Sequence, residues 1–295
     1  MNAPRMGDFT LTGSAKFDLM AGITQSLAGR VGRVELPPLS AAELGVQLLP
    51  ANLHDFLLKG GYTALYDRSL AADDWFPNYV ASYLERDVRQ LLAVRDLTQF
   101  QRFVRMCAAR SGQMLNLAAL GADCGTSAVT ARQWLSVLES SYIAMRLPPH
   151  HRNFGKRLVK TPKLYFLDTG LTAWLLGIRH ADTLSTHVAR GALFETWVVA
   201  ELVKQRFNAG RAAELFFWRD NVGHEIDILF ETPKGLQAIE IKSGSTFASD
   251  WPQALRKWTV LAVQPVLQPW IVYGGEGHYA REGCDVTGWR ELSSG

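Results

Sequence analysis

Three short alternating segments at residues 215–219, 225–230 and 237–242 constrain the fold of this chain more than any other feature. Each is rich in β-branched and aromatic residues, and clusters of turn residues separate them, which is typical of strands joined by tight connections. The expected elements around them are a helix at 193–207 before the strands, then a helix near 252–263 and a strand at 269–272. The order α-β-β-β-α-β predicts a mixed α/β domain.

The second and third strands carry charged residues that a hairpin would bring together. With a two-residue turn between the strands, Asp227 lies opposite Glu240 and Glu225 lies opposite Lys242. A bulge at Gly235 would shift this register by one residue and separate the pairs. The pairing of the two acids therefore depends on a regular hairpin.

Alternation along the same strands predicts which face is apolar. Ile226 and Ile228 should share one face of the second strand, and Ile239 and Ile241 should share one face of the third. The charged residues of both strands should then lie together on the opposite face.

Two carboxylates side by side repel each other, and a divalent cation would stabilise them. Mg²⁺ binds one or two carboxylates together with water and phosphate oxygens. We expect Asp227, Glu240 and the carbonyl of Ile241 to hold Mg²⁺, and Lys242 to orient or activate a water molecule. Glu195, on the preceding helix, is a third acid that can assist. The alternative is a set of structural ion pairs on a solvated sheet face.

The middle of the chain has the pattern of a winged helix-turn-helix. A helix is expected at 115–123 with Gly125 as its C-terminal cap, and Thr126 or Ser127 can cap the next helix. Extended segments at 143–147 and 163–167 then flank a basic stretch. Helix, turn, helix and basic hairpin is the element order of that DNA-binding motif.

Residues 141–167 contain six Lys or Arg residues and no acid, which favours a surface that binds a polyanion. Exposed residues on the second helix can reach bases or phosphates, although they can equally be solvated surface. The candidate DNA contacts are Thr130, Arg132, Gln133, Arg152, Lys156, Arg157, Lys160 and Lys163.

The first 110 residues contain two different patterns. Residues 53–110 are helical by their three- and four-residue apolar spacing. The N-terminal segment has too few elements to fold alone, so we expect it to need the rest of the chain or a partner. Its expected elements are a strand at 9–12, a helix at 16–27, a strand at 31–36 and a short helix at 41–48.

Composition excludes several classes of protein. The three cysteines are far apart, which argues against a disulfide framework and a cysteine-built zinc site. The chain shows neither a signal-peptide pattern nor an apolar run of about 18 residues, so we expect a cytoplasmic protein without a membrane span. A net charge of +3 alone says little about partners.

The charged residues of the last domain resemble a known superfamily. A helical acid (Glu195), a strand acid (Asp227) and Glu-x-Lys (Glu240 to Lys242) resemble the motif of PD-(D/E)xK, restriction-endonuclease-like nucleases. Ile226 stands where that motif has proline. The resemblance implies a metal-dependent nuclease fold and assigns catalysis to those four charged residues.

Other motifs extend the resemblance to the C-terminal domain of a prokaryotic AAA-type ATPase family, over about residues 53–273. They are Leu58-Lys59-Gly60-Gly61-Tyr62, Tyr83-Leu84-Glu85-Arg86-Asp87-Val88, Lys156-Arg157-Leu158-Val159-Lys160 and Tyr165-Phe166-Leu167-Asp168-Thr169-Gly170-Leu171. Residues 10–44 resemble the last part of that family's ATPase domain, with Ser14 at its sensor position. The implied domains are an ATPase remnant (1–52), a helical region (53–110), a winged helix-turn-helix (111–175) and a nuclease-like domain (176–295).

A phosphate-binding G-x-x-x-x-G-K-[S/T] loop is absent from the sequence, so we expect no ATP binding or hydrolysis. Two functions stay open. The first is a DNA-binding protein with a Mg²⁺-dependent nuclease site. The second is a catalytically silent DNA-binding or regulatory protein, or a subunit that self-associates or pairs with an intact ATPase through residues 1–52.

Overall fold

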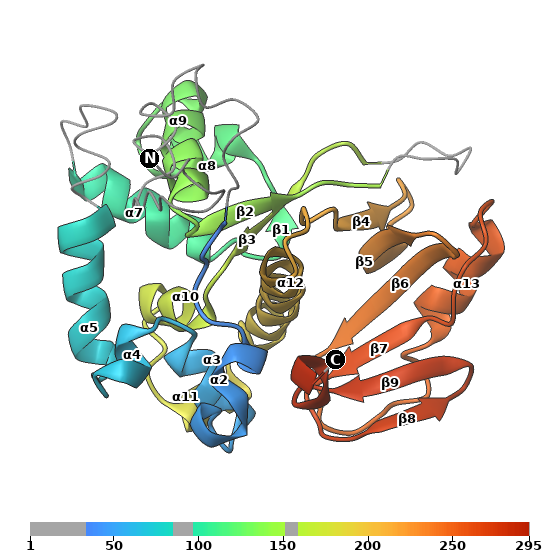
Figure 1. Cartoon of the computed structure of the whole chain (residues 1–295). Coiled ribbons are helices and arrows are strands. Elements are labelled where there is room, and N and C mark those ends of the chain that lie inside the picture. Colours follow the sequence, from blue (N-terminus) through green and yellow to red (C-terminus); the bar gives the residue numbers. More distant parts are fainter. Residues whose placement is uncertain (1–33, 85–96, 151–158, 295) are drawn as a thin grey trace, which may run out of the picture.

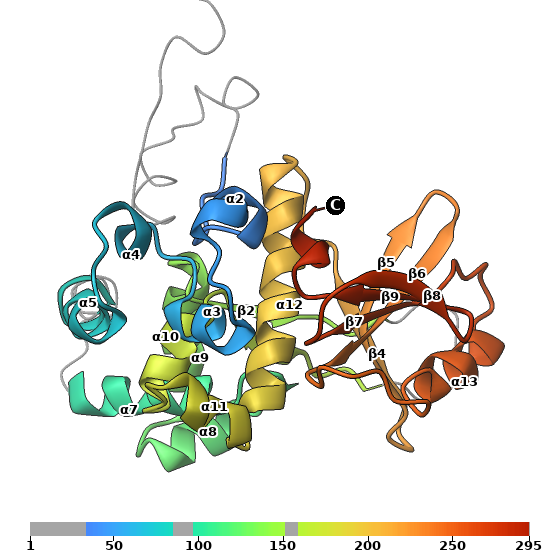
Figure 2. The same cartoon turned by 90° about the horizontal axis from the view of Figure 1, so that it is seen from below.

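The computed structural model describes residues 34–84, 97–150 and 159–294 and arranges them in two parts (Figure 1). One part has helices around a three-stranded sheet, and the other is a six-stranded sheet with a helix against each face. The long helix α12 (Arg190–Asn208) lies between the two parts, as Figures 1 and 2 both show. The mixed α/β class predicted from the sequence is confirmed at this level.

The first part consists mostly of short helices. Its described elements are α2 (Ala41–Leu48), α3 (Leu53–Lys59), α4 (Ala64–Asp67), α5 (Ala72–Tyr79), the π-helix η2 (Val80–Leu84), α7 (Leu97–Ala108), β1 (Gln113–Met114), α8 (Leu117–Asp123), α9 (Ala128–Ser140), β2 (Ala144–Leu147), β3 (Lys163–Phe166), α10 (Thr169–Leu175) and α11 (Ala181–Thr186).

Local capping explains where α8 and α9 begin and end. The Asn116 side chain accepts a hydrogen bond from the Ala119 N–H at 3.0 Å and starts α8. Gly125 follows that helix with a φ of 70°, the left-handed conformation that glycine tolerates best. Ser127 then caps α9 by accepting from the Thr130 N–H at 3.0 Å. The predicted helix, turn and helix are confirmed, and Ser127 provides the cap.

The small antiparallel sheet has the order β1-β3-β2. One hydrophobic core joins α7, α8, α9 and this sheet with α5 and α10, and it includes Phe76, Phe103, Trp134 and Phe166. The predicted segments 53–110 and 111–175 therefore share a core.

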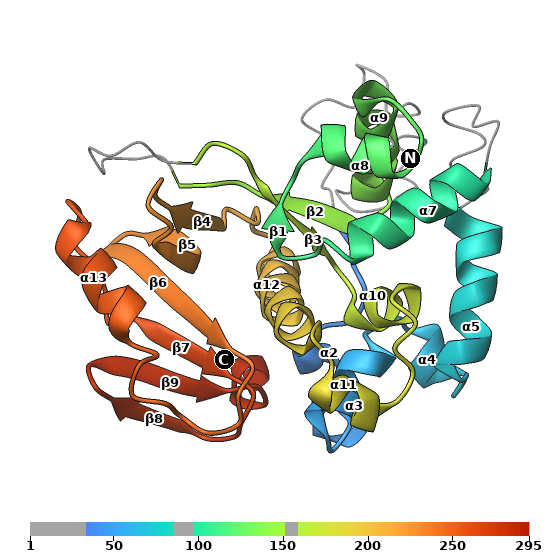
Figure 3. The same ribbon diagram turned by 180° about the vertical axis from the view of Figure 1, so that it is seen from behind.

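The second part is built on a six-stranded sheet of order β4-β5-β6-β7-β9-β8, which Figure 3 shows from behind. Strands β4 to β6 are antiparallel neighbours, β6, β7 and β9 run parallel, and β8 closes the edge antiparallel to β9. The elements are β4 (Phe216–Arg219), β5 (Glu225–Thr232), β6 (Gly235–Lys242), α13 (Gln253–Leu261), β7 (Trp270–Tyr273), β8 (His278–Arg281), β9 (Cys284–Gly288) and the 3₁₀ turn η3 (Glu291–Ser294).

Helices cover both faces of this sheet. On one face α12 packs through Trp197 and Val198, and on the other α13 packs through Leu255 and Trp258 (Figure 2). The predicted order α-β-β-β-α-β is confirmed for α12 to β7. The sequence analysis missed the β8–β9 hairpin, whose outer strand is mostly exposed and so lacks a clear apolar pattern.

The β5–β6 hairpin has the predicted register. Thr232 pairs with Gly235 and Ile228 pairs with Ile239, so no bulge at Gly235 shifts the strands. The ladder ends at the Ile228–Ile239 pair, one residue before Asp227 and Glu240.

The predicted faces of β5 are wrong. Ile228 packs in the core under α12, whereas Ile226 packs in the core under α13. The pairing with β4 explains this: Phe216 pairs with Leu229 and Trp218 with Ile226, so β5 has one extra residue between these pairs. A bulge of this kind interrupts period-two alternation, and here it lies at Asp227.

Asp168 joins two segments that are far apart in the sequence. Its buried carboxylate accepts hydrogen bonds from the Gly61 N–H at 2.6 Å and from the Leu171 N–H at 2.8 Å, where it caps α10. A Cβ on Gly60 would come within 2.4 Å of this carboxylate, and a Cβ on Gly170 within 2.5 Å of the Lys59 carbonyl oxygen. The Gly-Gly and Asp-Thr-Gly motifs therefore serve packing.

The described part of the N-terminal segment packs on α12. Both carboxylate oxygens of Glu201, which is fully buried on α12, lie 3.0 Å from the Ala41 N–H. Ser40 and Glu43 form a reciprocal cap at the start of α2, so the predicted helix is confirmed at its start, although the non-helical backbone of Gly45 (φ 61°) interrupts it. Residues 34–36 of the predicted strand have no regular structure, and the elements predicted before them lie outside the described residues.

Among the helices that the structure describes, none has the length and apolar character needed to cross a membrane. The three cysteines are buried as free thiols.

Candidate functional site

A partly buried acidic cluster lies where β5 and β6 separate. The backbone ladder between the strands reaches Ile228 and Ile239 and stops one residue before Asp227 and Glu240. There the Asp227 carboxylate replaces a backbone acceptor, taking a hydrogen bond from the Ile241 N–H at 2.8 Å. The bulge thus directs the Asp227 side chain towards the backbone of β6.

Glu240 and Lys242 form the second component of the cluster. Lys242 Nζ lies 2.7 Å from Glu240 Oε1, and Glu240 is only 6% exposed. The other carboxylate oxygen, Oε2, is buried and has no hydrogen-bond partner within the described residues. A buried acceptor without a partner costs free energy unless a ligand or water satisfies it.

Glu195 on α12 and Glu225 on β5 form the third component, and both bind Lys163. Lys163 Nζ is 3.0 Å from Glu195 Oε1 and also forms an ion pair with Glu225 Oε1. Tyr165 donates its hydroxyl to the same Glu195 oxygen at 2.5 Å. Arg219 pairs with the remaining oxygen of Glu225 at 3.0 Å.

The electrostatics of the cluster are those of crowded, desolvated acids. Burial and the neighbouring carboxylates of Glu240 and Glu195 raise the pKa of Asp227 well above its usual range. Burial also raises the pKa of Glu240, despite the opposing charge of Lys242. Burial opposes the charged form of Lys242, but attraction to Glu240 and Asp227 outweighs it and raises its pKa.

Asp227 and Glu240 are the residues that fit a divalent cation. They lie on adjacent strands, their charges repel, and Glu240 Oε2 needs a partner. Within residues 34–84, 97–150 and 159–294, however, three or more His, Cys, Asp or Glu side chains nowhere converge on one ion position. The carboxylate of Glu195 is directed at Lys163 and Tyr165 instead. The candidate donors that remain close together are therefore the two carboxylates of Asp227 and Glu240.

A cavity of about 290 Å³ lies beside the cluster, between the sheet and α13. Glu225, Glu240 and Lys242 line it together with Trp251 and Lys257. The Glu240–Lys242 pair is therefore accessible from the α13 side of the sheet, opposite to α12.

The predicted DNA contacts have different fates in the structure. Arg132 and Gln133 are exposed on α9, Thr130 is half-buried beside the Ser127 cap, and Lys160 is exposed. Arg152, Lys156 and Arg157 lie outside the described residues.

Lys163 is a correction to the predicted DNA contacts. Its side chain is only 4% exposed and is held by two carboxylates. β3 alternates, with Leu164 and Phe166 in one core and Tyr165 in the core under α12. Lys163 shares the face of Tyr165, which faces α12 and the acidic cluster.

Sequence reasoning assembled Glu195, Asp227, Glu240 and Lys242 but missed the contributions of Lys163 and Tyr165. The usable signal was the alternation of β3, because a lysine two residues from a core tyrosine shares its face. Which carboxylates the lysine meets depends on how β3 packs on α12, and local sequence does not encode that packing.

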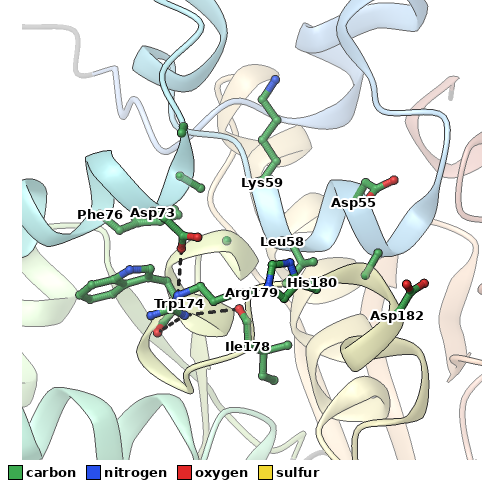
Figure 4. Close-up of a pocket in the computed structure, with 14 residues that line it drawn as sticks. Asp55, Leu58, Lys59, Asp73, Phe76, Trp174, Ile178, Arg179, His180 and Asp182 are labelled. Atoms are coloured by element: carbon green, nitrogen blue, oxygen red, sulfur yellow. Dashed lines mark hydrogen bonds and ion pairs between the residues drawn. The ribbon is translucent and has the colours of Figure 1, made fainter.

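A larger cavity, of about 490 Å³, lies between α3, α5, α10 and α11, away from the acidic cluster (Figure 4). Its central cation, Arg179, pairs with Asp73 at 2.9 Å and donates to the Trp174 carbonyl oxygen at 2.7 Å. None of the candidate site residues that the structure describes lines it. Its arginine serves contacts between helices.

Comparisons with known proteins divide the chain at α12. Residues 50–182 match the family described as Domain of unknown function (DUF8612), and residues 190–292 match the one described as Domain of unknown function (DUF4143). No solved structure matches the chain.

Two curated relatives are the uncharacterized protein Mb2031c of Mycobacterium bovis and the uncharacterized protein Rv2008c of Mycobacterium tuberculosis. Each is 33% identical to this chain over 243 residues, which are 81% of this chain and 53% of the relative. The chain thus spans about half the length of the curated relatives it matches. Three components of the acidic cluster, Glu195, Asp227 and the Glu240–Lys242 pair, lie in the segment that matches DUF4143.

Proposed function

We propose that this chain is a DNA-binding protein whose C-terminal domain has a Mg²⁺-dependent phosphodiesterase site of the PD-(D/E)xK type. Asp227, Glu240 and the Ile241 carbonyl would hold the metal, and Lys242 would act on the attacking water. Glu195 would assist from α12, on the face of the sheet opposite to the cavity. This proposal joins the sequence motif to the geometry of the site.

The observation that carries the proposal is the pair of neighbouring acids, Asp227 and Glu240, at the end of β5 and β6. Asp227 and Glu240 are desolvated and mutually repelling, and a Glu240 oxygen has no partner within the described residues. A purely structural ion pair would satisfy these groups. A site that awaits a cation and a phosphate would leave them in this state.

Lys242 is placed for the chemistry that the proposal assigns to it. Its ammonium lies 2.7 Å from Glu240 and lines the cavity beside the cluster. From there it can donate to an attacking water and stabilise negative charge on a phosphate. A bound divalent cation would polarise the phosphate and make a coordinated water more acidic.

The helical part supports the DNA-binding half of the proposal. The element order α7-β1-α8-α9-β2-β3 and the sheet order β1-β3-β2 fit a winged helix-turn-helix. Arg132 and Gln133 are exposed on α9, which would be the second helix of the helix-turn-helix formed by α8 and α9.

The two ends of the basic stretch also lie beside the candidate nuclease domain. The His150 N–H donates to the Phe217 carbonyl oxygen at 2.7 Å, and the Val159 N–H donates to that of Arg219 at 3.2 Å. Both acceptors are on β4, whose Arg219 pairs with Glu225 of the cluster. DNA held by Lys160, the residue after Val159, would therefore lie near the acids.

Cleavage of plasmid DNA with Mg²⁺ or Mn²⁺ tests this function, with Asp227→Asn as the variant. Glu231→Gln is the matched control, because Glu231 is a half-exposed acid on the same strand that pairs with His150. We expect cleavage by the wild type and by Glu231→Gln, and loss of cleavage in Asp227→Asn.

Equal cleavage by all three proteins would indicate a contaminant and contradict the site. DNA binding without cleavage in any protein would favour the second candidate, a catalytically silent DNA-binding protein. The pairing of Glu195 with Lys163 and Tyr165 is the observation on which that candidate rests.

From the resemblance of residues 10–44 we also propose that the N-terminal segment derives from an AAA-type ATPase domain and mediates self-association or pairing with an intact ATPase. The docking of Ala41 on Glu201 supports a segment that folds only against another surface. Sedimentation of the full chain tests self-association, and a monomer at high concentration would contradict it.

A further inference from the structure

Lys163 reaches the acidic cluster from a different sheet. It begins β3 of the small sheet, where it pairs with Met114 of β1 and Leu147 of β2. Its side chain crosses to α12 and β5, where its ammonium meets Glu195 and Glu225. A cation from the helical part is thus built into the C-terminal domain.

The surroundings of this ammonium form a closed cage. Lys163 is 4% exposed, and the Phe217 ring centroid lies 5.6 Å from its Nζ. Tyr165 binds the same Glu195 oxygen from the neighbouring position on β3. A Cβ on Gly112, just before β1, would approach the Glu195 carboxylate to 3.7 Å. Such a cage holds one desolvated cation against two carboxylates.

The four acids of the cluster therefore fall into two pairs. Glu195 and Glu225 share the buried Lys163, whereas Glu240 binds the more exposed Lys242, whose charge also attracts Asp227. Lys242 binds Glu240 from the cavity side, and the other Glu240 oxygen has no hydrogen-bond partner within the described residues. Sites that hydrolyse phosphate esters with two metals place the ions about 3.5–4 Å apart between shared carboxylates.

We propose that Lys163 is a resident organic cation in the second metal position of the acidic cluster, so that the chain binds one divalent cation rather than two. The inference rests on the proposed metal site at Asp227 and Glu240. It also assigns the small sheet a role in the site, because β3 delivers the cation.

Mn²⁺ titration of the metal-free full chain tests this inference, with calorimetry for stoichiometry and thermal unfolding for stability. The variant is Lys163→Met, which removes the ammonium but fills the space. Arg219→Met is the matched control, because Arg219 pairs with Glu225 from a position that is 39% exposed. Lys163→Arg retains a cation in the cage.

We expect one Mn²⁺ per chain for the wild type, Arg219→Met and Lys163→Arg, and two for Lys163→Met. If Lys163→Met does not fold without metal, Mn²⁺ should restore its folding, since the ion replaces the lost charge. Mn²⁺ should raise the melting temperature of Lys163→Met by at least about twice as much as that of Arg219→Met, because two ions then bind the folded state of Lys163→Met.

The outcomes separate this inference from the proposed function. One Mn²⁺ in both the wild type and Lys163→Met, or failure of Mn²⁺ to restore an unfolded Lys163→Met, overturns the inference and leaves the function standing. Two ions in the wild type also overturn it. No ion in the wild type but one in Lys163→Met contradicts the metal site at Asp227 and Glu240, and it overturns the inference that rests on that site. No ion in either protein overturns both.

Discussion

Asp168 and Asp227 are both aspartates with a raised pKa, yet their surroundings differ: Asp168 is buried, whereas Asp227 is partly exposed. Burial raises the pKa of Asp168, but backbone N–H groups of Gly61 and Leu171 bind both of its oxygens. Asp227 accepts from Ile241 and faces the carboxylates of Glu240 and Glu195. One acid is satisfied by the backbone, and the other is crowded by like charge.

The difference separates structural acids from candidate functional ones. Folding brings the backbone donors of Gly61 and Leu171 around Asp168, so this acid satisfies N–H groups that burial would otherwise leave without a partner. Repulsion at Asp227 lowers stability and is expected where a ligand relieves it. The motif that contains Asp168 is thus a packing motif, although it contributed to the family resemblance as much as the acids of the cluster did.

The largest expected effect concerns activity. Asp227→Asn should reduce Mg²⁺-dependent DNA cleavage by about 100- to 1000-fold, the range for removing a group that stabilises a transition state. Because asparagine can still accept from the Ile241 N–H, the fold should persist. Asp168→Asn, measured as cleavage per folded molecule, should stay near wild type, and a similar loss in both variants would contradict the distinction.

The second effect concerns stability. Asp168→Ala removes the cap of α10 and leaves the buried Gly61 N–H without its acceptor. Loss of a cap and of a buried hydrogen bond should together lower the free energy of unfolding by about 2–4 kcal/mol. Urea unfolding measures this, and a loss below about 0.5 kcal/mol would show that the junction tolerates a missing acceptor.

The third effect has the opposite sign and depends on pH. Folding raises the pKa of Asp227, so protonation of this carboxyl favours the folded chain. The stabilisation is fully present below the unfolded pKa of about 4 and is lost as the pH rises through the pKa of the folded chain. When a chelator removes metal ions, the free energy of unfolding of Asp227→Asn at pH 8 should therefore exceed that of the wild type by at least about 1 kcal/mol. This difference should shrink towards pH 4. A gain that does not vary with pH would contradict the repulsion.

The smallest effect concerns DNA affinity. Arg132→Ala and Lys160→Ala should each weaken binding a few-fold and reduce the slope of log affinity against log salt by about 1. Arg146 is the matched control, because Glu139 already binds it at 2.6 Å. Arg146→Ala should change the slope less, and an equal change in all three variants would remove α9 and Lys160 as specific contacts.

Much of the fold was predictable because local signals agreed with tertiary packing. Ser127 and Gly125 defined the ends of α8 and α9, and the two-residue turn at Pro233 and Lys234 fixed the register of β5 and β6. Two features were not predictable: the β8–β9 hairpin, and the single core that residues 53–110 and 111–175 share. An exposed edge strand and a contact between distant segments leave no periodic pattern in the sequence.

The site was predictable in membership but not in arrangement. Element order was enough to place Glu195, Asp227 and Glu240 in one cluster. The bulge at Asp227 changed the face of Ile226, and it arises from pairing with β4 rather than from β5 itself. Lys163 was expected on an exposed surface because charge alone was considered, whereas its strand alternation places it inside.

Anomalous diffraction from a crystal soaked in Mn²⁺ tests the central claim most directly, because it shows where a cation binds. The account predicts one peak between Asp227 and Glu240, with a carboxylate oxygen of each residue at about 2.0–2.5 Å from the ion. Lys163 should still bind Glu195 and Glu225. A well-ordered cluster without a peak, or a peak that displaces Lys163 while Asp227 and Glu240 stay free, would contradict it.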